Sequence, residues 1–292
     1  MKEQFNKGLL LTSLGSFWWG FIGVIYFQYV SFIGHIELIV HRCLWTAVML
    51  ILTTTIYSKW SLFKAIIKNK KLLLGLFASG FLIFINWAVW IYAVATERII
   101  DASFGYFIMP IISILLGSIF FKEKLNSKRI FSILLVSVSI LILIFLNLKN
   151  LPWVGLIVAF SWAFYNLIRK KINVDTDVGI LIESLYILPF ALIVFYFITK
   201  NGFNDFGLSN LSLSFFLILA GPMTVIPLFL YVRGVELIGL GPTGMIFYIT
   251  PTLQFILGYF YYNEDFSLVK FVSFIIIWIA VVIYLKDLYE TY

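Results

Sequence analysis

The chain has 292 residues, of which 62% are hydrophobic and 12% are charged, and its mean hydropathy is +1.03. A soluble domain is about half apolar and about a quarter charged, so this composition excludes a soluble domain and indicates an integral membrane protein. The single cysteine, Cys43, excludes an intrachain disulfide framework.

Apolar segments follow one another along nearly the whole chain. A helix needs about 20 residues to cross the hydrocarbon layer, and ten such segments predict an all-α integral membrane protein with ten transmembrane helices. The runs are continuous rather than alternating, which argues against a transmembrane β-barrel. No cleavage site follows the first run, so it is interpreted as an uncleaved span. In chain order the segments are 8–30, 36–57, 72–95, 101–121, 129–147, 151–169, 178–198, 212–232, 242–262 and 267–286.

Lys and Arg residues are distributed unevenly among the predicted loops. With the N-terminus in the cytoplasm, 16 of the 21 Lys and Arg residues fall on the cytoplasmic side and four on the other, while Arg42 lies within a span. Basic residues favour cytoplasmic loops, so a multi-pass protein with both termini in the cytoplasm is predicted. The net charge of +7 is then explained by topology and contact with the lipid bilayer, and no nucleic-acid partner is expected.

One apolar pattern occurs twice. Residues 106–124 read YFIMPIISILLGSIFFKEK, and residues 247–265 read FYITPTLQFILGYFYYNED. An offset of 141 positions aligns the same P-x6-G-x5-E pattern in both stretches, with Pro110 on Pro251. The repetition predicts that the chain consists of two homologous halves.

The predicted halves are residues 1–147 and 148–292, with five spans each. Because five is odd, the second half enters the membrane in the opposite orientation, which places Glu123 inside and Glu264 outside as helix-end or gate residues. Inverted repeats are an architecture of secondary transporters, whose substrate site lies near the midplane between the repeats. A monomer is sufficient for such a symmetry, and a dimer is compatible with it.

Pro110 and Pro251 lie near the middle of their spans. Proline lacks an N–H and clashes with the preceding turn, so the carbonyls of Tyr106 and Phe247 lose their usual partners. In lipid this is tolerated only where other groups or water satisfy the carbonyl. We expect conformational kinks beside a central cavity; the alternative is a packing kink without ligand contact.

Ionisable residues inside spans are costly and are therefore candidates for function. Glu37 and His41 are four residues apart and share a helix face, and Arg42 follows. Together with Glu183 in the seventh span, Glu37 and His41 are the proton-coupling candidates, because a buried Glu and a His can exchange protons near neutral pH. Arg42 suits an anionic group such as a carboxylate. The alternatives are an ion pair between Arg42 and Glu37, and a contact of Glu183 with Arg42 or with polar groups of the cavity.

Uncharged polar and aromatic residues complete the predicted substrate site. Polar amides within spans bind substrate or join helices, and both interpretations stay open. Aromatic walls with a few polar groups suit amphipathic or aromatic solutes, with core packing as the alternative. The substrate-binding candidates are Trp19, Arg42, Asn86, Tyr106, Tyr165, Tyr248 and Gln254.

Several strings resemble a known family. They are IELIVHRCLWT (36–46), NWAVWIYAV (86–94), DASFGYFIMP (101–110), FSWAFYNLIRKKI (160–172), ILIESLYILP (180–189) and TPTLQFILGYFYYNE (250–264). With the repeat, they are similar to the drug/metabolite transporter superfamily with two EamA-type domains, and to its RarD-like subgroup. The resemblance implies a bacterial inner-membrane transporter linked to export of drugs or metabolites.

The expected function is a secondary transporter that moves a small organic solute, such as a drug, an amino acid or another metabolite. Efflux by alternating access is favoured, with proton coupling as an option. No P-loop, HExxH, paired CxxC or G-x-S-x-G motif is present, so no enzyme, metal or cofactor is expected. The alternatives are an uncoupled facilitator, a membrane sensor or assembly protein, and a flippase for lipid-linked substrates.

Overall fold

The computed structural model describes residues 2–30, 32–95, 99–147, 153–261 and 268–291, and every regular element within these ranges is a helix. The predicted first half contains α1 (Lys2–Phe17), the π-helix η1 (Trp18–Ile22), α2 (Gly23–Tyr29), α3 (His35–Ile56), α4 (Trp60–Lys68), α5 (Lys70–Ala95), α6 (Ile99–Phe121) and α7 (Ser127–Asn147). The second contains α8 (Trp153–Ile172), α9 (Thr176–Lys200), α10 (Leu211–Ile238), α11 (Leu240–Ile246), α12 (Ile249–Phe260) and α13 (Leu268–Thr291).

Six helical stretches among the described residues are long and apolar enough to cross a membrane. They are Lys2–Tyr29, His35–Ile56, Lys70–Ala93, Thr176–Lys200, Leu211–Ile238 and Phe271–Thr291. An all-α membrane protein is thereby confirmed. Helices α6, α7, α8 and the α11–α12 pair occupy the other four predicted segments, and the ten-span inverted repeat stays a prediction.

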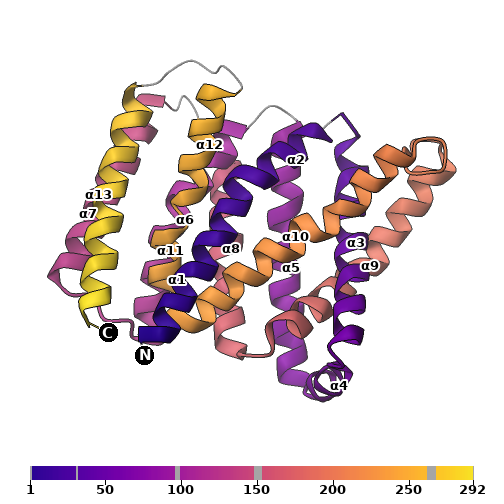
Figure 1. Cartoon of the computed structure of the whole chain (residues 1–292), viewed down its shortest axis with the longest axis horizontal. Coiled ribbons are helices and arrows are strands. Elements are labelled where there is room, and N and C mark those ends of the chain that lie inside the picture. Colours follow the sequence, from indigo (N-terminus) through magenta and orange to yellow (C-terminus); the bar gives the residue numbers. More distant parts are fainter. Residues whose placement is uncertain (1, 31, 96–98, 148–152, 262–267, 292) are drawn as a thin grey trace.

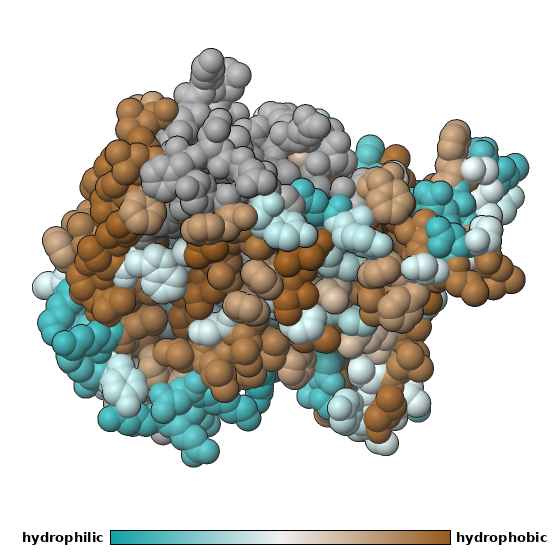
Figure 2. Space-filling view, turned by 45° about the horizontal axis from the view of Figure 1, so that its top comes forward, coloured by the Kyte–Doolittle hydropathy of each residue, from teal (hydrophilic) through white to brown (hydrophobic). Residues whose placement is uncertain are grey.

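The outer surface is apolar across the middle of the bundle. Figure 2 shows a broad band of hydrophobic side chains, with hydrophilic ones along the lower edge and at the upper right. Large aromatic side chains face outward, among them Phe81, Phe145 and Phe190. An exposed apolar surface of this extent is incompatible with water and suits lipid.

The helices pack in pairs that join distant parts of the chain. Helix α1 packs against α10, α5 against α8, α3 against both α9 and α10, α6 against α8 and α11, and α7 against α13. Both termini and α4 lie at one end of the bundle, which we call the termini face (Figure 1). Helix α4 lies between the predicted spans 36–57 and 72–95, where the sequence predicts no helix. Its Ile66 is buried, while Lys64 and Lys68 are exposed.

The two repeated prolines have different local effects. Helix α6 continues through Pro110, whereas the corresponding segment is divided into α11 and α12 just before Pro251. The Phe247 carbonyl accepts a hydrogen bond from the N–H of Thr250 at 2.9 Å, which replaces the donor that Pro251 lacks. The break places Phe247 at the junction of two short helices. Glu264 lies outside the described residues.

Candidate functional site

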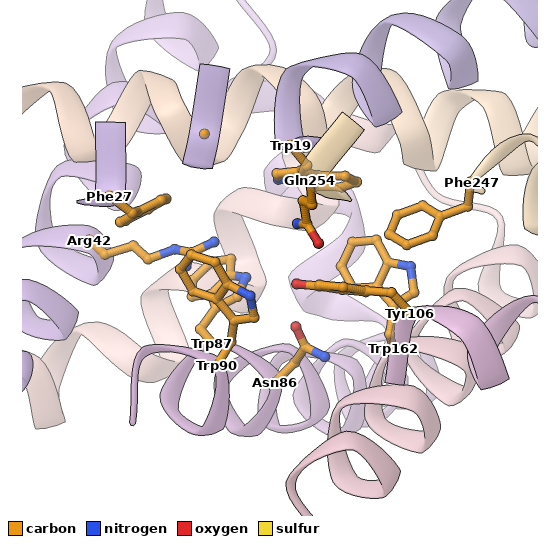
Figure 3. Close-up of a pocket in the computed structure, with 11 residues that line it drawn as sticks. Trp19, Phe27, Arg42, Asn86, Trp87, Trp90, Tyr106, Trp162, Phe247 and Gln254 are labelled. Carbon is orange, nitrogen blue, oxygen red and sulfur yellow. The ribbon is translucent and has the colours of Figure 1, made fainter. Parts of the chain in front are cut away.

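A cavity of about 50 Å³ lies between the helices at the centre of the bundle (Figure 3). Its lining comes from η1, α2, α3, α5, α6, α8, α12 and the junction before α12. The lining residues are Trp19, Gly23, Phe27, Arg42, Asn86, Trp87, Trp90, Tyr106, Trp162, Phe247 and Gln254. The cavity therefore combines side chains from both predicted halves.

One end of the cavity is cationic. The Arg42 guanidinium carbon lies 4.9 Å from the ring centroid of Phe27 and 4.7 Å from that of Trp87. Its Nε donates a hydrogen bond to Thr224 Oγ1 on α10 at 3.0 Å. Arg42 is only 5% exposed, and no carboxylate of a described residue lies within 4.0 Å of it. The alternative ion pair between Arg42 and Glu37 is not formed.

Polar groups occupy the middle of the cavity. Asn86 Nδ2 donates hydrogen bonds to the Val158 carbonyl at 2.9 Å and to Ser161 Oγ at 3.1 Å, so Asn86 joins α5 to α8. In Figure 3 its carboxamide oxygen, the Tyr106 hydroxyl and the Gln254 carboxamide point into the same space. Asn86 thus holds two helices together and still offers an acceptor to the cavity.

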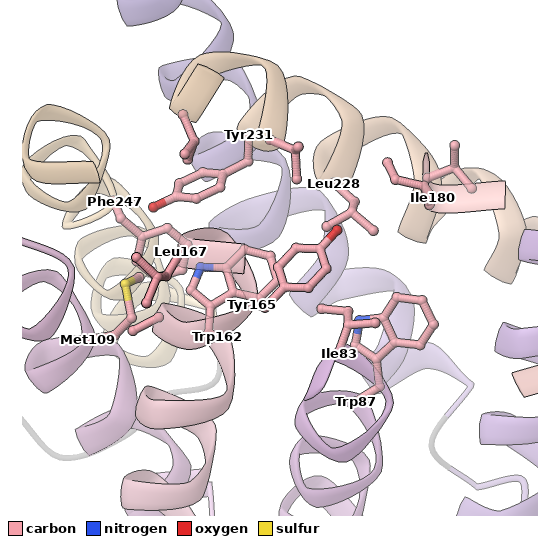
Figure 4. Close-up of a cluster of buried hydrophobic side chains, with 14 of the residues drawn as sticks. Ile83, Trp87, Met109, Trp162, Tyr165, Leu167, Ile180, Leu228, Tyr231 and Phe247 are labelled. Atoms are coloured by element: carbon pink, nitrogen blue, oxygen red, sulfur yellow. The ribbon is translucent and has the colours of Figure 1, made fainter. Parts of the chain in front are cut away.

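The other end is aromatic. The rings of Trp19 and Trp162 meet edge to face with centroids 5.0 Å apart, and Tyr231 lies 5.5 Å from Trp162 and 5.7 Å from Trp19. Phe247 lies 5.6 Å from Tyr106 and closes this wall. Figure 4 shows Trp162, Tyr231 and Phe247 within the largest buried cluster. A planar apolar group would therefore meet ring faces and edges on several sides.

Glu183 belongs to a separate buried group. Its carboxylate accepts hydrogen bonds from Ser79 Oγ at 2.5 Å and from the Tyr165 hydroxyl at 3.2 Å, and it lies 3.6 Å from Arg169 Nη1. The partner of Glu183 is therefore Arg169 rather than Arg42. Arg169 is one of the 16 basic residues that the charge distribution assigns to the cytoplasmic side, but it is 1% exposed, because α8 and α9 enclose it.

Glu37 and His41 also lie away from the cavity. The His41 Nε2 atom is 3.4 Å from Glu37 Oε1, which confirms that the two side chains share a helix face. The Trp45 indole donates a hydrogen bond to His41 Nδ1 at 3.2 Å, and Glu37 accepts one from the N–H of Asp205 at 2.8 Å. The pair links α3 to the α9–α10 connection. No cluster of potential metal ligands occurs among the described residues.

The cavity brings together five of the seven predicted substrate-binding residues, namely Trp19, Arg42, Asn86, Tyr106 and Gln254. Neither Tyr165 nor Tyr248 lines the cavity. The Tyr165 hydroxyl donates a hydrogen bond to Glu183, and the Tyr248 hydroxyl donates one to the Phe107 carbonyl at 2.9 Å. Substrate contact by the five stays a prediction.

Sequence reasoning did not predict the roles of Phe27, Trp87, Trp90, Trp162 and Phe247. For Trp90 a signal was present: it follows Asn86 by four residues and thus shares its helix face. Phe247 precedes Pro251 by four residues, at a kink expected beside a central cavity, which was a second signal. Phe27, Trp87 and Trp162 have no signal of this kind, because aromatic residues are frequent throughout the chain, at 19%.

Among the described residues, polar contacts of Glu123, Lys59 and Arg129 join the predicted halves at the termini face. Glu123 accepts hydrogen bonds from the N–H groups of Leu240 and Gly241, and from Lys170 Nζ, each at 2.9 Å. The other two contacts are Lys59 with Asp175 and Asp177, at 3.1 and 2.7 Å, and Arg129 with Asp287, at 2.8 Å.

The Lys59 ammonium is stabilised by its two acidic partners. Burial alone would lower the pKa of Lys59, but its hydrogen bonds to Asp177 and Asp175 outweigh this effect and raise the pKa. The Lys59 contact therefore persists as an ion pair throughout the neutral range.

The chain matches known proteins along nearly its full length. The model of the EamA-like transporter family matches residues 6–145 and again residues 152–286. Protein RarD of Escherichia coli (strain K12) is 34% identical over 285 residues, which cover 98% of this chain and 96% of the relative. An uncharacterized transporter of Vibrio cholerae is 31% identical over 98% of this chain and 94% of its own length. The uncharacterized transporter YojE of Bacillus subtilis is 30% identical over 96% of this chain and 93% of its own.

A solved crystal structure supports the fold alone. It superposes with a TM-score of 0.71 at 11% identity and covers 96% of this chain and 97% of its own. The family matches and the apolar helices together place the protein in the membrane with several spans. The chain belongs to the EamA-like transporter family, within its RarD-like subgroup, and is a membrane transporter rather than an enzyme.

Proposed function

We propose that the protein exports a small organic solute across the bacterial inner membrane by alternating access, with the central cavity as the substrate site. The observation that carries this proposal is the composition of the cavity wall. Arg42, Asn86 and Tyr106 come from the predicted first half, while Trp162 and Gln254 come from the second. A movement of one half against the other therefore changes access to the cavity.

Ten spans in two inverted halves are part of the proposal, and the helix contacts support them. Exchanging the halves relates α1–α2 to α8, α3 to α9, α5 to α10, α6 to α11–α12 and α7 to α13. The α1–α10 contact then becomes α5–α8, and α3–α10 becomes α5–α9. The contacts α3–α9, α6–α11 and α7–α13 each join a helix to its own counterpart in the other half, so the exchange leaves them unchanged. The two separate family matches agree with this division.

Individual residues repeat the same symmetry. A Cβ at Gly80 would lie 3.3 Å from the Glu183 backbone, and a Cβ at Gly221, 141 positions later, would lie 2.5 Å from the Trp45 carbonyl. Both glycines thus allow close approach between equivalent helix pairs. The hydrogen-bonded residues Phe107 and Tyr248 are also 141 positions apart, as expected for equivalent residues beside a pseudo-two-fold axis.

The cavity is contracted in this structure. Its volume is about 50 Å³, whereas a dry engineered cavity of about 150 Å³ holds one benzene molecule. Binding of an organic solute therefore requires the halves to separate. With the termini face assigned to the cytoplasm by its basic loops, the polar contacts of Glu123, Lys59 and Arg129 would close the cytoplasmic side and must break for solute uptake from within.

Proton coupling through Glu37, His41 or Glu183 remains part of the proposal. The Glu37–His41 pair is buried and links α3 to the α9–α10 connection, so protonation would change a contact between the halves. Glu183 contacts α5 and α8 through Ser79, Tyr165 and Arg169. A change of its charge would therefore alter the packing of three helices.

A second hollow, of about 360 Å³, lies between α3 and α10 near the termini face. Apolar side chains such as Leu50, Val225 and Phe229 form most of its wall, with Lys59 and Asp177 at one end. A flippase for lipid-linked substrates requires a polar cavity open to the bilayer, and this hollow does not have that character. The solute transporter is therefore preferred.

Reconstitution in proteoliposomes tests the proposal. Uptake and efflux of a metabolite library are measured with and without a pH gradient. We expect flux of at least one organic solute, and its absence with folded protein would contradict the transport function. Flux that ignores the gradient and is unchanged in Glu183→Gln, His41→Gln and Glu37→Gln would instead contradict proton coupling and favour the uncoupled facilitator.

A further inference from the structure

Arg42 differs from the other described arginines in having no acidic partner. Arg129 lies 2.8 Å from Asp287, Arg169 lies 3.6 Å from Glu183, and Arg233 lies 2.8 Å from Glu236. Arg42 is 5% exposed and has no carboxylate within 4.0 Å among the described residues. A charge within a membrane bundle is costly unless a counter-charge or hydrogen-bonding groups compensate it. The missing counter-charge therefore points to a ligand.

The remaining donors of Arg42 face the cavity. Its Nε donates a hydrogen bond to Thr224, and its guanidinium carbon lies over the rings of Phe27 and Trp87. The hydrogen bonds described for Arg42 leave both terminal nitrogens, with four N–H groups, free to bind a ligand. Figure 3 shows the guanidinium reaching toward the cavity from one end. A planar carboxylate fits such a fixed fork through two parallel hydrogen bonds.

The lining away from Arg42 indicates what the uncharged part of the ligand is. Beyond Arg42 the lining consists of aromatic rings, two carboxamides and one glycine, and includes no acidic residue. Trp19, Trp162 and Phe247 suit a planar apolar group at the end opposite Arg42. The Asn86 and Gln254 carboxamides suit a polar substituent between the two ends.

The same arrangement disfavours amines. The carboxylate of Glu183 is held by Arg169, Ser79 and Tyr165, and that of Glu37 by His41 and the Asp205 N–H. Neither Glu183 nor Glu37 lines the cavity. An ammonium group would thus meet Arg42 without a compensating acid, and a neutral amide would leave Arg42 unpaired.

We propose that the cavity selects amphipathic organic anions, with the carboxylate on Arg42 and a planar apolar body against Trp19, Trp162 and Phe247. This inference rests on the proposed transport function and specifies its substrate class. Arg42 acts as the anion-binding residue, and Thr224 positions it. Short aliphatic carboxylates lack the planar apolar body, aromatic amides are uncharged, and aromatic alkylamines carry a positive charge instead of a negative one.

Four probes separate these requirements in proteoliposomes of the full chain: 3-phenylpropanoate, 3-phenylpropanamide, 3-phenylpropan-1-amine and propanoate. Hydrogen bonds to a charged group are worth about 10- to 100-fold in affinity. We expect the aromatic carboxylate to be bound and transported better than the amide by about this factor, and the other two less still. Comparable flux of amide or amine and carboxylate would overturn the proposal.

Variants assign the selectivity to Arg42. In Arg42→Gln the preference for carboxylate over amide should disappear, while Arg42→Lys, which keeps the charge but loses the fork, should retain part of it. Lys64→Gln removes one exposed positive charge outside the cavity and should leave the preference unchanged. An unchanged preference for carboxylate over amide in Arg42→Gln would show that Arg42 does not bind the carboxylate. A full preference in a correctly folded Arg42→Lys would show that two parallel hydrogen bonds from the guanidinium are not required.

Direct binding separates the two proposals. Four of the nine tryptophans, Trp19, Trp87, Trp90 and Trp162, line the cavity, so intrinsic fluorescence reports its occupancy. Saturable quenching by 3-phenylpropanoate without flux of any solute would contradict transport and keep the anion site. If other solutes are transported but 3-phenylpropanoate neither quenches the fluorescence nor is transported, the proposed anion site is contradicted and the transport function is supported. If Arg42→Gln does not fold, the quenching order of the four probes on the unmodified protein decides.

Discussion

The carboxylate of Glu123 lies in space that a side chain at Gly117 would need: a Cβ at Gly117 would be 2.5 Å from Glu123 Oε2. These are the glycine and the glutamate of the repeated P-x6-G-x5-E pattern. The chain turns back after α6, with the Glu123 N–H 3.2 Å from the Gly117 carbonyl. The absence of a side chain at Gly117 thus lets Glu123 reach the start of α11.

Replacing Glu123 should loosen the start of α11. In Glu123→Gln the charge-assisted hydrogen bonds to Leu240 and Gly241 are weakened, which should cost about 1 kcal/mol locally. Hydrogen exchange of these two amides should accelerate, and Glu3→Gln, an exposed change in α1, should not affect it. Equal protection in both variants would mean that the carboxylate does not stabilise this end of the helix.

Removing the Glu183 carboxylate should destabilise the protein strongly. Glu183→Gln leaves Arg169 buried without its counter-charge, and breaking a buried pair in this way costs about 3–5 kcal/mol. Thermal unfolding in detergent measures the loss. The double variant Glu183→Gln/Arg169→Gln should be more stable than the sum of the two single changes predicts, since it removes both charges. Additive losses would argue against a stabilising ion pair.

Close contact between α3 and α10 makes Gly221 sensitive to substitution. A Cβ there would lie 2.5 Å from the Trp45 carbonyl oxygen, so Gly221→Ala should force the helices apart and cost about 1–3 kcal/mol. Gly34→Ala is the matched control, because nothing lies within 4 Å of a Cβ at that position. Equal thermal stability of the two variants would show that α3 and α10 can separate at little cost.

Labelling should place the two ends of the bundle on opposite sides of the membrane. In a Cys43→Ser background, Asn201→Cys in the α9–α10 connection should react with an impermeant maleimide added to intact cells. Lys124→Cys, in the α6–α7 connection, should react only after permeabilisation. Reaction of both from outside, or the reverse order, would contradict the proposed orientation of the termini.

Much of the fold follows from local composition. Continuous apolar runs specify helices because lipid leaves backbone groups no other partners, so the positions of the long helices could be predicted, whereas the short helix α4 was not. The effect of Pro251 was also local: because Pro251 has no N–H, the Phe247 carbonyl accepts its hydrogen bond from the N–H of Thr250 instead. Helix α6 nevertheless continues through Pro110, and the same residue type thus had two outcomes in two packing environments.

The sequence by itself determined the class of protein, the helical segments and the repeated pattern, because these depend on hydropathy and on residues close in the chain. Only the tertiary structure decided which buried charges are paired. Arg42 and Glu183 are both charged residues inside predicted spans, yet α8 brings Arg169 to Glu183, while Arg42 faces Phe27, Trp87 and the cavity. Arg169 lies on the helix just before that of Glu183, whereas Thr224 and Ser79 lie 182 and 104 residues away from their partners Arg42 and Glu183. In each case contact depends on how the helices pack at a common depth.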